Sequence, residues 1–287
     1  MYDFAIVGGG IVGLSTGMSL SEQYPHAKIA IFEKENTWSH HQTGHNSGVI
    51  NSGIYYKPGS LKAEFAREGS RSMVEFCQEH HIEHEVCGKV IVATTQEEIP
   101  LLDRLYRRGL ANGLDIHHCD QSELHEIEPH VNGLAGIRVP STGIVNYTQV
   151  SEVFAKLIEQ RNGNLYLSTK IENIVQGKDH VTLETNRGDY QAKYLINCSG
   201  LHSDRITQMD QLKIDMKIIP FRGEYYELVP EKRHLVKHLI YPVPNPNFPF
   251  LGVHFTRTVE GGGEAGTNAV CARKRERNSK KRQSRRD

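Results

Sequence analysis

The sequence predicts a mixed α/β fold, and three observations lead to this prediction. A short, largely apolar run over residues 2–7 is typical of a buried parallel strand. A glycine-rich turn follows at once, and a helix to about residue 23 and a strand over 28–32 complete a βαβ unit. Four further short strands are expected at 164–168, 171–176, 180–185 and 190–197.

Three helices are expected outside this unit, over residues 61–80, about 96–112 and about 149–161. The last has the strongest signal, because its apolar residues between Val150 and Ile158 recur at helical spacing. Thr148 is its expected N-cap and Gly163 its expected stop. Glu128, beside Pro129, is expected in a surface turn.

The turn after the first strand, Gly8-Gly9-Gly10-Ile11-Val12-Gly13, carries the GxGxxG pattern of dinucleotide-binding proteins. Gly8 allows the tight turn, Gly10 lets backbone approach a pyrophosphate, and Gly13 lets helix and strand pack closely. Glu33 closes the second strand, 20 residues beyond Gly13, where its carboxylate accepts hydrogen bonds from a ribose diol. Its charge repels a 2′-phosphate, so NADP is disfavoured. We therefore expect a Rossmann-like dinucleotide-binding domain.

The pattern does not by itself distinguish NAD from FAD. Two other features favour FAD. A glycine-rich segment at 44–53 follows the second strand, where a flavin has room to lie. A late strand also ends in the small residues Cys198-Ser199-Gly200, where backbone again approaches a cofactor.

Charge is distributed unevenly along the chain. Lys plus Arg (34) equals Asp plus Glu (34), which excludes a global bias toward nucleic acid. Nine of these bases lie in residues 271–287, and the other 270 residues carry a formal charge of −7. The basic tail has no interleaved aromatic residues, so it offers only phosphate attraction, and a disordered end is expected.

The number and spacing of the cysteines, together with the hydropathy of the sequence, indicate where in the cell the protein is expected. The five cysteines form no CxxC pair and their number is odd, which argues against a disulfide framework or a structural zinc site; no metal site is predicted. No apolar run approaches the roughly 20 residues that cross a bilayer. The first strand starts too close to Met1 for a signal peptide. A cytoplasmic location is expected, with peripheral membrane attachment as an alternative.

Residues 41–63, HQTGHNSGVINSGIYYKPGSLKA, closely resemble the L-2-hydroxyglutarate oxidase/dehydrogenase family. Further similar blocks are 87–93 (CGKVIVA), 142–147 (TGIVNY), 197–206 (NCSGLHSDRI), 219–226 (IPFRGEYY) and 248–257 (FPFLGVHFTR). These blocks extend over most of the chain, and several are long and particular to that family.

The resemblance implies an FAD-binding domain of the glutathione-reductase/D-amino-acid-oxidase type with an interleaved substrate domain on a mixed or antiparallel sheet. We expect the FAD-binding domain at 1–80 and 145–210 and the substrate domain at 81–144 and 211–262. Residues 263–287 are then a remnant and the basic tail. Members of that family continue well beyond this point, so the chain is expected to be C-terminally truncated.

The implied reaction is FAD-dependent oxidation of L-2-hydroxyglutarate to 2-oxoglutarate by hydride transfer, with oxygen or membrane quinone as electron acceptor. Asn51 stands where that family typically has His, which bears on activity. Two alternatives remain open. One is an amine or amino-acid oxidase of the same fold, and the other is a non-catalytic fragment that holds FAD poorly.

The chemistry requires a base for the hydroxyl proton and cations for the carboxylates. His254 is the preferred base, because imidazole titrates near neutral pH. Arg222 and Arg257 are the expected carboxylate clamps, and Tyr225 adds a hydroxyl hydrogen bond. The alternatives are a structural histidine, salt-bridged arginines and a packed aromatic ring.

The predicted FAD-binding residues come from three segments. They are Gly8, Gly10, Gly13 and Glu33 in the βαβ unit, Gly44, His45, Asn46, Ser47 and Gly48 in the following loop, and Ser199 and Gly200 after the late strand.

Overall fold

The computed structural model of the chain describes residues 1–247, 252–272 and 274–276. The prediction of a disordered basic tail falls mostly on 277–287, outside the described residues. The chain forms two compact units. The first unit comprises Met1–Asn46, Tyr147–Phe221 and Cys271–Asp287, and the second comprises Ser47–Asn146 and Arg222–Val270.

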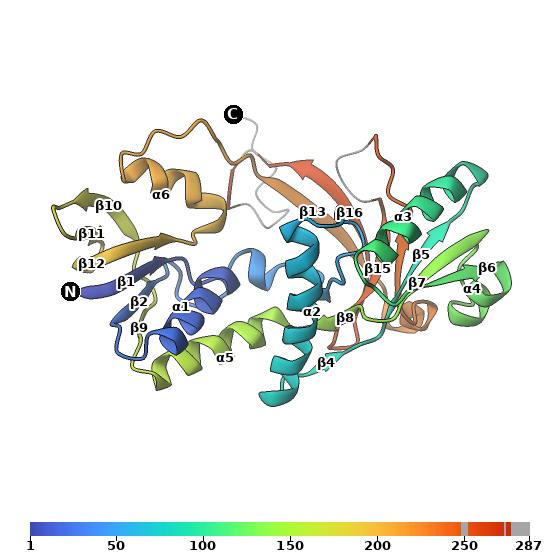
Figure 1. The fold of residues 1–287 in the computed structure, drawn as a ribbon, viewed down its shortest axis with the longest axis horizontal. Coiled ribbons are helices and arrows are strands. Elements are labelled where there is room, and N and C mark those ends of the chain that lie inside the picture. Colours follow the sequence, from blue (N-terminus) through green and yellow to red (C-terminus); the bar gives the residue numbers. More distant parts are fainter. Residues whose placement is uncertain (248–251, 273, 277–287) are drawn as a thin grey trace. The chain divides into compact units, whose positions relative to one another are not determined.

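A six-stranded sheet organises the first unit (Figure 1), with strand order β10-β11-β12-β1-β2-β9. The strands β12, β1, β2 and β9 run parallel, whereas β10, β11 and β12 form an antiparallel meander. Their bounds are β1 (Tyr2–Val7), β2 (Ile29–Phe32), β9 (Asn164–Tyr166), β10 (Ile171–Gln176), β11 (Val181–Thr185) and β12 (Gly188–Asn197).

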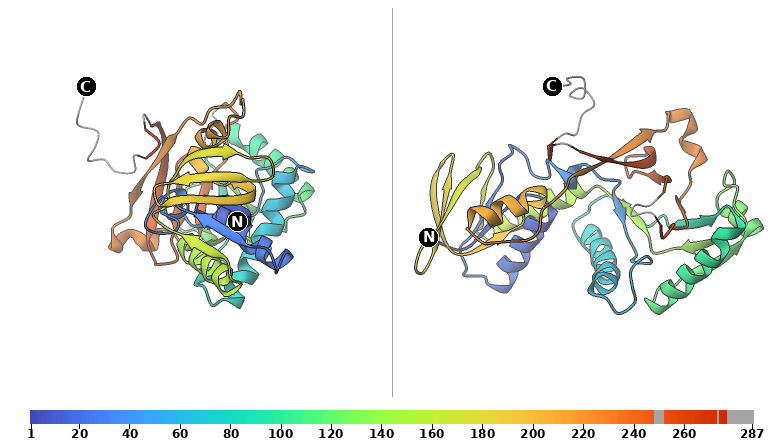
Figure 2. Two further views of the ribbon diagram at one scale, coloured as in Figure 1. Left: turned by 90° about the vertical axis from the view of Figure 1, so that its left-hand side faces the viewer. Right: turned by 90° about the horizontal axis from the view of Figure 1, so that it is seen from above.

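Helices cover this sheet. Two of them, α1 (Ile11–Gln23) and α5 (Tyr147–Gln160), pack against each other beside the parallel strands, and α6 (Ser203–Met209) follows β12 (Figure 2). Short 3-10 turns are η1 (Gln42–Gly44) and η3 (Gly200–His202). The close approach of α1 depends on Gly17, where an added Cβ would lie 2.6 Å from Ile31 Cδ1 and 3.2 Å from Ile158 Cδ1.

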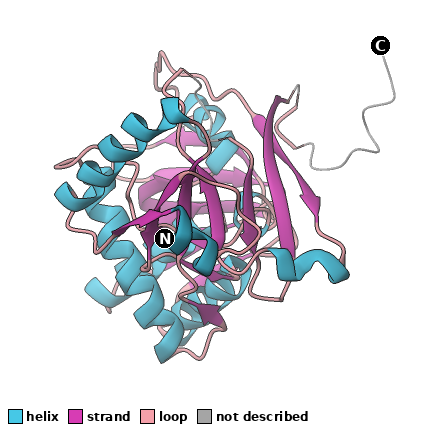
Figure 3. Cartoon of the chain, turned by 90° about the vertical axis from the view of Figure 1, so that its right-hand side faces the viewer, coloured by secondary structure: helices cyan, strands magenta, loops and turns pink. Residues whose placement is uncertain are grey.

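The second unit contains a seven-stranded sheet of order β13-β16-β15-β14-β5-β7-β6 and a three-stranded sheet of order β3-β8-β4 (Figure 3). In the larger sheet β14 and β5 are parallel, and the pairs β14–β15, β15–β16, β5–β7 and β6–β7 are antiparallel. The predicted mixed α/β fold is therefore confirmed.

The strands of the larger sheet are β5 (Lys89–Ala93), β6 (His117–Asp120), β7 (Ala135–Val139), β13 (Phe221–Glu227), β14 (Leu239–Pro242), β15 (His254–Arg257) and β16 (Gly263–Cys271). The smaller sheet comprises β3 (Val49–Ile50), β4 (His84–Glu85) and β8 (Gly143–Val145). The helices are α2 (Leu61–Glu79), η2 (Gln96–Glu98), α3 (Ile99–Ala111), α4 (Gln121–Ile127) and η4 (Pro230–Leu235).

The core of the second unit follows the alternation of side chains along β5, which points successive residues to opposite faces of the sheet. Ile91 and Ala93 pack in a cluster with Leu102 of α3, whereas Val90 and Val92 pack with Leu124 of α4. Both faces of β5 are therefore covered, and all five of its residues are buried.

The two units divide the chain differently from the expected domains. Residues 47–80 lie in the second unit, because β3 pairs with β8 and Asn112 Nδ2 donates to the carbonyls of Gly53 and Tyr56 at 3.3 and 3.0 Å. Residues 263–271, which were expected to belong to the remnant and the basic tail, form β16, and this strand pairs with β15. The assignment of cofactor and substrate to the two units remains a prediction.

Two local expectations were wrong. The helix α5 already includes Tyr147, so Thr148 lies in its first turn instead of capping it. Glu128 is fully buried instead of lying at the surface. Its carboxylate has partners there, because it accepts a hydrogen bond from the Lys237 backbone N–H at 3.3 Å and lies 2.8 Å from His238 Nδ1. Among the described residues, no helix has the length and apolar character needed to cross a bilayer.

Candidate functional site

The glycine turn between β1 and α1 has a backbone that only glycine satisfies. Gly8 has φ +115°, and a Cβ there would lie 2.4 Å from the Cys198 carbonyl oxygen. At Gly13 a Cβ would lie 1.9 Å from the Gly8 carbonyl oxygen. Contacts below 3.0 Å force the backbone apart, so both glycines are required for the turn, as the sequence pattern indicates.

The N-terminus of α1 is open to an anion. Its N-cap, Gly10, has no side chain to accept from the first turn, and Ile11 N–H donates to Thr43 Oγ1 at 3.0 Å. Among the described residues, no acceptor pairs with the N–H of Val12 or Gly13, and Val12 is 62% exposed. Unpaired N–H groups and the helix dipole together attract phosphate, so this turn fits a dinucleotide pyrophosphate.

Glu33 lies against this turn, immediately after β2. Its Oε2 accepts from Gly9 N–H at 2.7 Å and its Oε1 accepts from Glu35 N–H at 2.9 Å. The residue is buried, so these two bonds hold the carboxylate in place. Each carboxylate oxygen can accept a second hydrogen bond, which fits the predicted contact with a ribose diol.

Two further predicted segments meet the glycine turn within the first unit. A Cβ on Gly10 would lie 3.2 Å from Thr43 Oγ1, which places the loop before Gly44 beside the turn. The strand β12 ends at the same place, because Cys198 N–H donates to the Val7 carbonyl at 2.8 Å. Ser199 Oγ then donates to Asn197 Oδ1 at 2.6 Å, and Gly200 has φ +53°.

The loop over residues 44–48 is ordered by its own side chains. His45 Nδ1 donates to the His41 carbonyl at 2.9 Å, and Asn46 Nδ2 donates to the Thr43 carbonyl at 2.6 Å. Ser47 and Gly48 belong to the second unit, where Gly48 has φ +67° and its carbonyl accepts from Val145 N–H at 2.8 Å. Contact of these residues with FAD remains a prediction.

His254, the predicted base, is buried on β15 within the second unit. Its ring stacks on Tyr241 with centroids 4.4 Å apart and meets the ring of Tyr225 edge-on at 6.2 Å. Its Nδ1 lies 3.1 Å from the Gly252 carbonyl. A carbonyl only accepts, so Nδ1 carries the proton and Nε2 of the neutral ring is an acceptor.

The electrostatics of His254 favour this neutral form. Burial lowers the pKa of His254 below its usual value, and the charge of Lys89 lowers it further, against the opposing effect of the Gly252 carbonyl. A neutral imidazole with an unprotonated Nε2 can take a proton from a hydroxyl group, which is the role the sequence predicts.

The two predicted arginine clamps are paired with acids of the same unit. Arg257 Nη1 and Nη2 each lie 3.2 Å from the Glu85 carboxylate, and Arg257 Nη1 donates to the Lys237 carbonyl at 2.7 Å. Arg222 forms an ion pair with Glu224. Strand alternation places Arg257 on the face of β15 opposite His254, and Arg222 on the face of β13 opposite Tyr225.

The structure therefore brings His254 and Tyr225 together. The two arginines lie on the opposite faces of their strands and do not join them. It also places Lys89, which the sequence analysis did not single out, in this region. Lys89 Nζ lies 4.7 Å from the ring centroid of Tyr55 and 4.9 Å from that of Tyr241. One sequence feature could have identified Lys89: it stands at the start of the apolar run Val90–Ala93, and such a run is typical of a strand buried on both faces.

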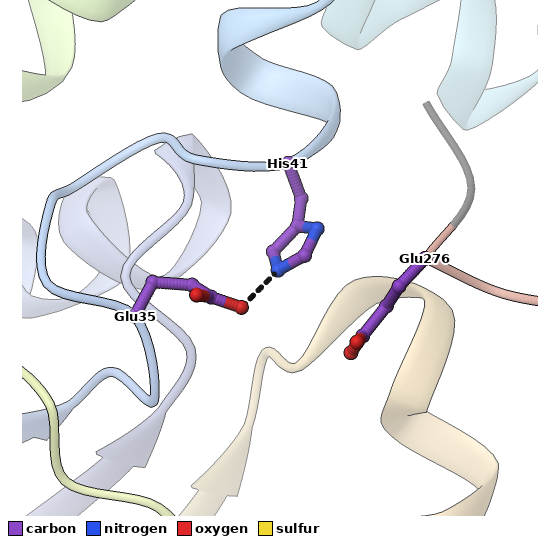
Figure 4. A group of neighbouring side chains, drawn as sticks. All are labelled: Glu35, His41 and Glu276. Atoms are coloured by element: carbon purple, nitrogen blue, oxygen red, sulfur yellow. Dashed lines mark hydrogen bonds and ion pairs between the residues drawn. The ribbon is translucent and has the colours of Figure 1, made fainter. Parts of the chain in front are cut away.

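A separate cluster in the first unit consists of Glu35, His41 and Glu276 (Figure 4). One carboxylate oxygen of each glutamate and one ring nitrogen of the histidine, the atoms that could coordinate a metal ion, all lie within 4.8 Å of one another. His41 Nε2 lies 2.9 Å from Glu35 Oε1. Lys34 Nζ pairs with Glu35 and lies 2.8 Å from Glu276 Oε1. Lys34 already pairs with both acids, so we interpret the cluster as an ion-pair network and not as a metal centre.

Comparison with protein families decides the class of protein. Residues 3–285 match the family model described as FAD dependent oxidoreductase. The chain belongs to the FAD dependent oxidoreductase family. Membership in this family confirms the predictions of an oxidoreductase and of FAD as its cofactor, and the glycine turn and Glu33 fit that cofactor.

Three relatives that this chain matches over most of its length are named L-2-hydroxyglutarate dehydrogenase. L-2-hydroxyglutarate dehydrogenase of Indibacter alkaliphilus is 50% identical over 277 residues, which cover 96% of this chain and 69% of the relative. The enzyme of that name from Escherichia coli (strain K12) is 47% identical, with 96% and 66% covered. The mitochondrial enzyme of Homo sapiens is 43% identical, with 96% and 62% covered. The chain thus spans about two thirds of the length of these relatives.

Solved structures of FAD dependent oxidoreductases share the fold. L-α-glycerophosphate oxidase from Mycoplasma pneumoniae, with FAD bound, matches with a TM-score of 0.86 at 24% identity, covering 96% of this chain and 73% of that one. Glycine oxidase from Geobacillus kaustophilus matches with a TM-score of 0.81 at 22% identity, covering 94% and 72%. At these identities the likeness concerns the fold alone.

Proposed function

We propose that the chain catalyses the FAD-dependent oxidation of L-2-hydroxyglutarate to 2-oxoglutarate. The observation that carries this proposal is the 50% identity to a relative named L-2-hydroxyglutarate dehydrogenase, over 96% of this chain. The glycine turn, the buried Glu33 and the neutral His254 supply the binding and proton-transfer groups that such a reaction requires.

FAD, when bound, supplies the acceptor for the hydride that leaves C2 of the hydroxy acid. The unpaired N–H groups at the start of α1 would hold its pyrophosphate, and the Glu33 carboxylate would accept hydrogen bonds from its ribose. The chain's own chemical contribution is proton transfer. His254 Nε2 takes the proton of the C2 hydroxyl as the carbonyl forms, while the Nδ1 bond to Gly252 fixes the ring's tautomer.

The substrate is a dicarboxylate, so its two negative charges need cationic or hydrogen-bonding partners. Tyr225, whose ring meets that of His254, would donate a hydrogen bond through its hydroxyl. Arg222 and Arg257 remain proposed clamps. Each would have to exchange its present acid, Glu224 or Glu85, for a substrate carboxylate.

Reduction of the bound flavin tests this proposal. The purified chain, loaded with FAD and kept anaerobic, is mixed with L-2-hydroxyglutarate while flavin absorbance is recorded. We expect the oxidised flavin band to bleach with the L-enantiomer and not with the D-enantiomer. Bleaching by glycine or another amino acid, without bleaching by L-2-hydroxyglutarate, would instead establish an amino-acid oxidase.

Oxygen or a quinone is proposed to reoxidise the reduced flavin, in the cytoplasm or at its membrane surface. A stopped-flow comparison separates the two acceptors. Fast reoxidation by dissolved oxygen, with hydrogen peroxide formed in equal amount, supports an oxidase. Slow reoxidation by oxygen and fast reoxidation by a soluble quinone supports a quinone-linked dehydrogenase.

A further inference from the structure

Lys89 is a buried cation in the middle of a sheet. It is only 1% exposed, and its strand β5 is flanked by β14 and β7, with Lys89 opposite Leu239 and Val139. Lysine almost never occupies such a position unless its charge is paired. The residue therefore needs an explanation that packing does not supply.

No acid in the described part of the chain compensates this charge. Within residues 1–247, 252–272 and 274–276, no carboxylate lies within 4.0 Å of Lys89 Nζ and no hydrogen bond to that atom occurs. Its recorded partners are the rings of Tyr55 and Tyr241. The face of a tyrosine ring attracts a cation, but it does not accept the three hydrogen bonds that an ammonium group offers. Burial accordingly lowers the pKa of Lys89 to about 7.

The surroundings of Lys89 contain other polar groups that have no partner among the residues the structure describes. The hydroxyl of Tyr55 is buried and has no hydrogen-bond partner among the described residues. The same holds for Thr256 Oγ1, two residues beyond His254 and so on the same face of β15. Buried polar groups are normally satisfied, so unpaired groups in one region indicate a missing polar ligand.

The predicted base belongs to the same group of side chains. Tyr241 contacts both residues, because Lys89 Nζ lies over its ring and His254 stacks on it. The cations Arg222 and Arg257 differ from Lys89, because each already has an acidic partner. Lys89 is thus the cation near His254 whose charge the described residues leave uncompensated.

We propose that Lys89 binds a carboxylate group of the substrate beside His254, with the Tyr55 hydroxyl as an additional donor. The inference rests on the proposed function in so far as the substrate is a 2-hydroxy dicarboxylate. An ammonium group over two tyrosine rings, one of which also stacks on the proton acceptor, combines charge for the acid with proximity to the hydroxyl that reacts. Lys89 is then a substrate-binding residue.

Binding of the product 2-oxoglutarate tests the proposal without turnover. Calorimetric titration compares the wild-type chain with Lys89→Met, which keeps the side-chain length and removes the charge. We expect the dissociation constant to rise about 30-fold or more, as when one partner of a buried charge pair is removed. Lys89→Arg should recover part of the affinity. Lys193→Met, which removes an exposed lysine paired with Asp3, is the matched control and should bind like wild type.

A second ligand tells which carboxylate is bound. 2-Oxobutyrate lacks the distal carboxylate, so its affinity should be insensitive to Lys89→Met if Lys89 holds that group. Equal losses for both ligands indicate the carboxylate next to the carbonyl. Each of these results supports the proposal, whereas a change of less than twofold for both ligands overturns it.

The wild-type chain provides a measurement that does not depend on a variant's folding. With ¹³C at the lysine ε-carbon, the titration of Lys89 is followed by NMR with and without saturating 2-oxoglutarate. A carboxylate beside the ammonium group must raise the pKa of Lys89, and an unchanged pKa contradicts the proposal.

These outcomes separate the inference from the proposed function. If 2-oxoglutarate binds equally well without Lys89, the inference fails and the proposed function stands. If an amino acid binds in place of 2-oxoglutarate and depends on Lys89, the proposed function fails and the inference stands. If the wild-type chain binds no carboxylate ligand of this set, both fail.

Discussion

The Glu33 carboxylate accepts a hydrogen bond from the Gly9 amide nitrogen at 2.7 Å. This bond joins the end of β2 to the glycine turn that follows β1, so one buried acid fixes the turn. The same carboxylate accepts from Glu35 N–H. Its geometry therefore depends on backbone donors on both sides.

Glu33→Gln should weaken FAD binding. A glutamine side chain has one acceptor oxygen, so its NH₂ group must face Gly9 N–H or Glu35 N–H and one backbone donor loses its partner. We expect the dissociation constant of FAD to rise about tenfold, equivalent to roughly 1.4 kcal/mol. Flavin fluorescence quenching measures it. Glu35→Gln, which alters a side chain paired with Lys34 and His41, is the control. Equal affinities for wild type and Glu33→Gln would remove Glu33 from the cofactor site.

Two glycine-to-alanine substitutions should have opposite effects. In Gly13→Ala the new Cβ meets the Gly8 carbonyl oxygen at 1.9 Å, so the turn must open, and we expect a loss of about 1–3 kcal/mol together with loss of bound FAD. At Gly69, within α2, an added Cβ meets nothing within 4 Å. Gly69→Ala should therefore stabilise the chain by about 0.5–1 kcal/mol, because alanine favours the helix. Urea unfolding compares them, and a stable, FAD-bound Gly13→Ala variant would contradict the packing argument.

The structural features that could be predicted from the sequence are those determined by residues close together along the chain. The turn from Gly8 to Gly13 has its own backbone requirements, and α5 has its own apolar periodicity, so both follow from a short stretch of chain. The segments over 44–53 and 198–200 were expected near a cofactor because of their small residues. In the structure Thr43, just before the first segment, and Cys198, in the second, both lie at the glycine turn.

The parts that were missed depend on partners far along the chain. Glu128 is expected at the surface from its local sequence, but His238 and its backbone, 110 residues later, bury and satisfy it. Arg257 has the chemistry of a carboxylate clamp, but Glu85, 172 residues earlier, already pairs with it. Such contacts leave no periodic pattern in the sequence. The role proposed for Lys89 likewise follows only from the structure, which shows no acidic partner for it among the described residues.

Lys89→Met should make the chain more stable and less able to bind its substrate. The pKa of Lys89 is about 7 in the folded chain, whereas an unperturbed lysine, as in the unfolded chain, has a pKa of 10.5. This shift is equivalent to on the order of 5 kcal/mol. Between about pH 7 and pH 10.5 the unfolded chain binds more protons than the folded chain, so the wild-type free energy of unfolding rises with pH over this range. Below about pH 7 the folded chain bears the full free-energy cost of burying the ammonium group.

The gain from Lys89→Met is therefore largest at acidic pH. We expect an increase of a few kcal/mol in the free energy of unfolding near pH 6 and a smaller one near pH 10. Denaturant titrations at both pH values, with Lys193→Met as the exposed control, measure the difference. A Lys89→Met variant that is less stable than wild type at pH 6 would show that the ammonium group has a structural partner.

His254→Asn should reduce turnover far more than substrate binding. Asparagine Nδ2 can still donate to the Gly252 carbonyl, but the variant has no group that takes a proton near neutral pH, so we expect kcat to fall about 10²- to 10⁴-fold. His117→Asn, at an exposed position of β6, should leave kcat unchanged.

The pH profile then identifies His254 as the base instead of a structural residue. In wild type, burial and the charge of Lys89 lower the pKa of His254, so the acid limb of kcat/KM should lie below the pH expected for a free imidazole. Protonation of His254 below that pKa removes the acceptor, and activity falls. In Lys89→Met the positive charge is gone, so the acid limb should move to higher pH even though the overall rate is lower. An acid limb that stays at the same pH in this variant would mean that a group other than His254 accepts the proton.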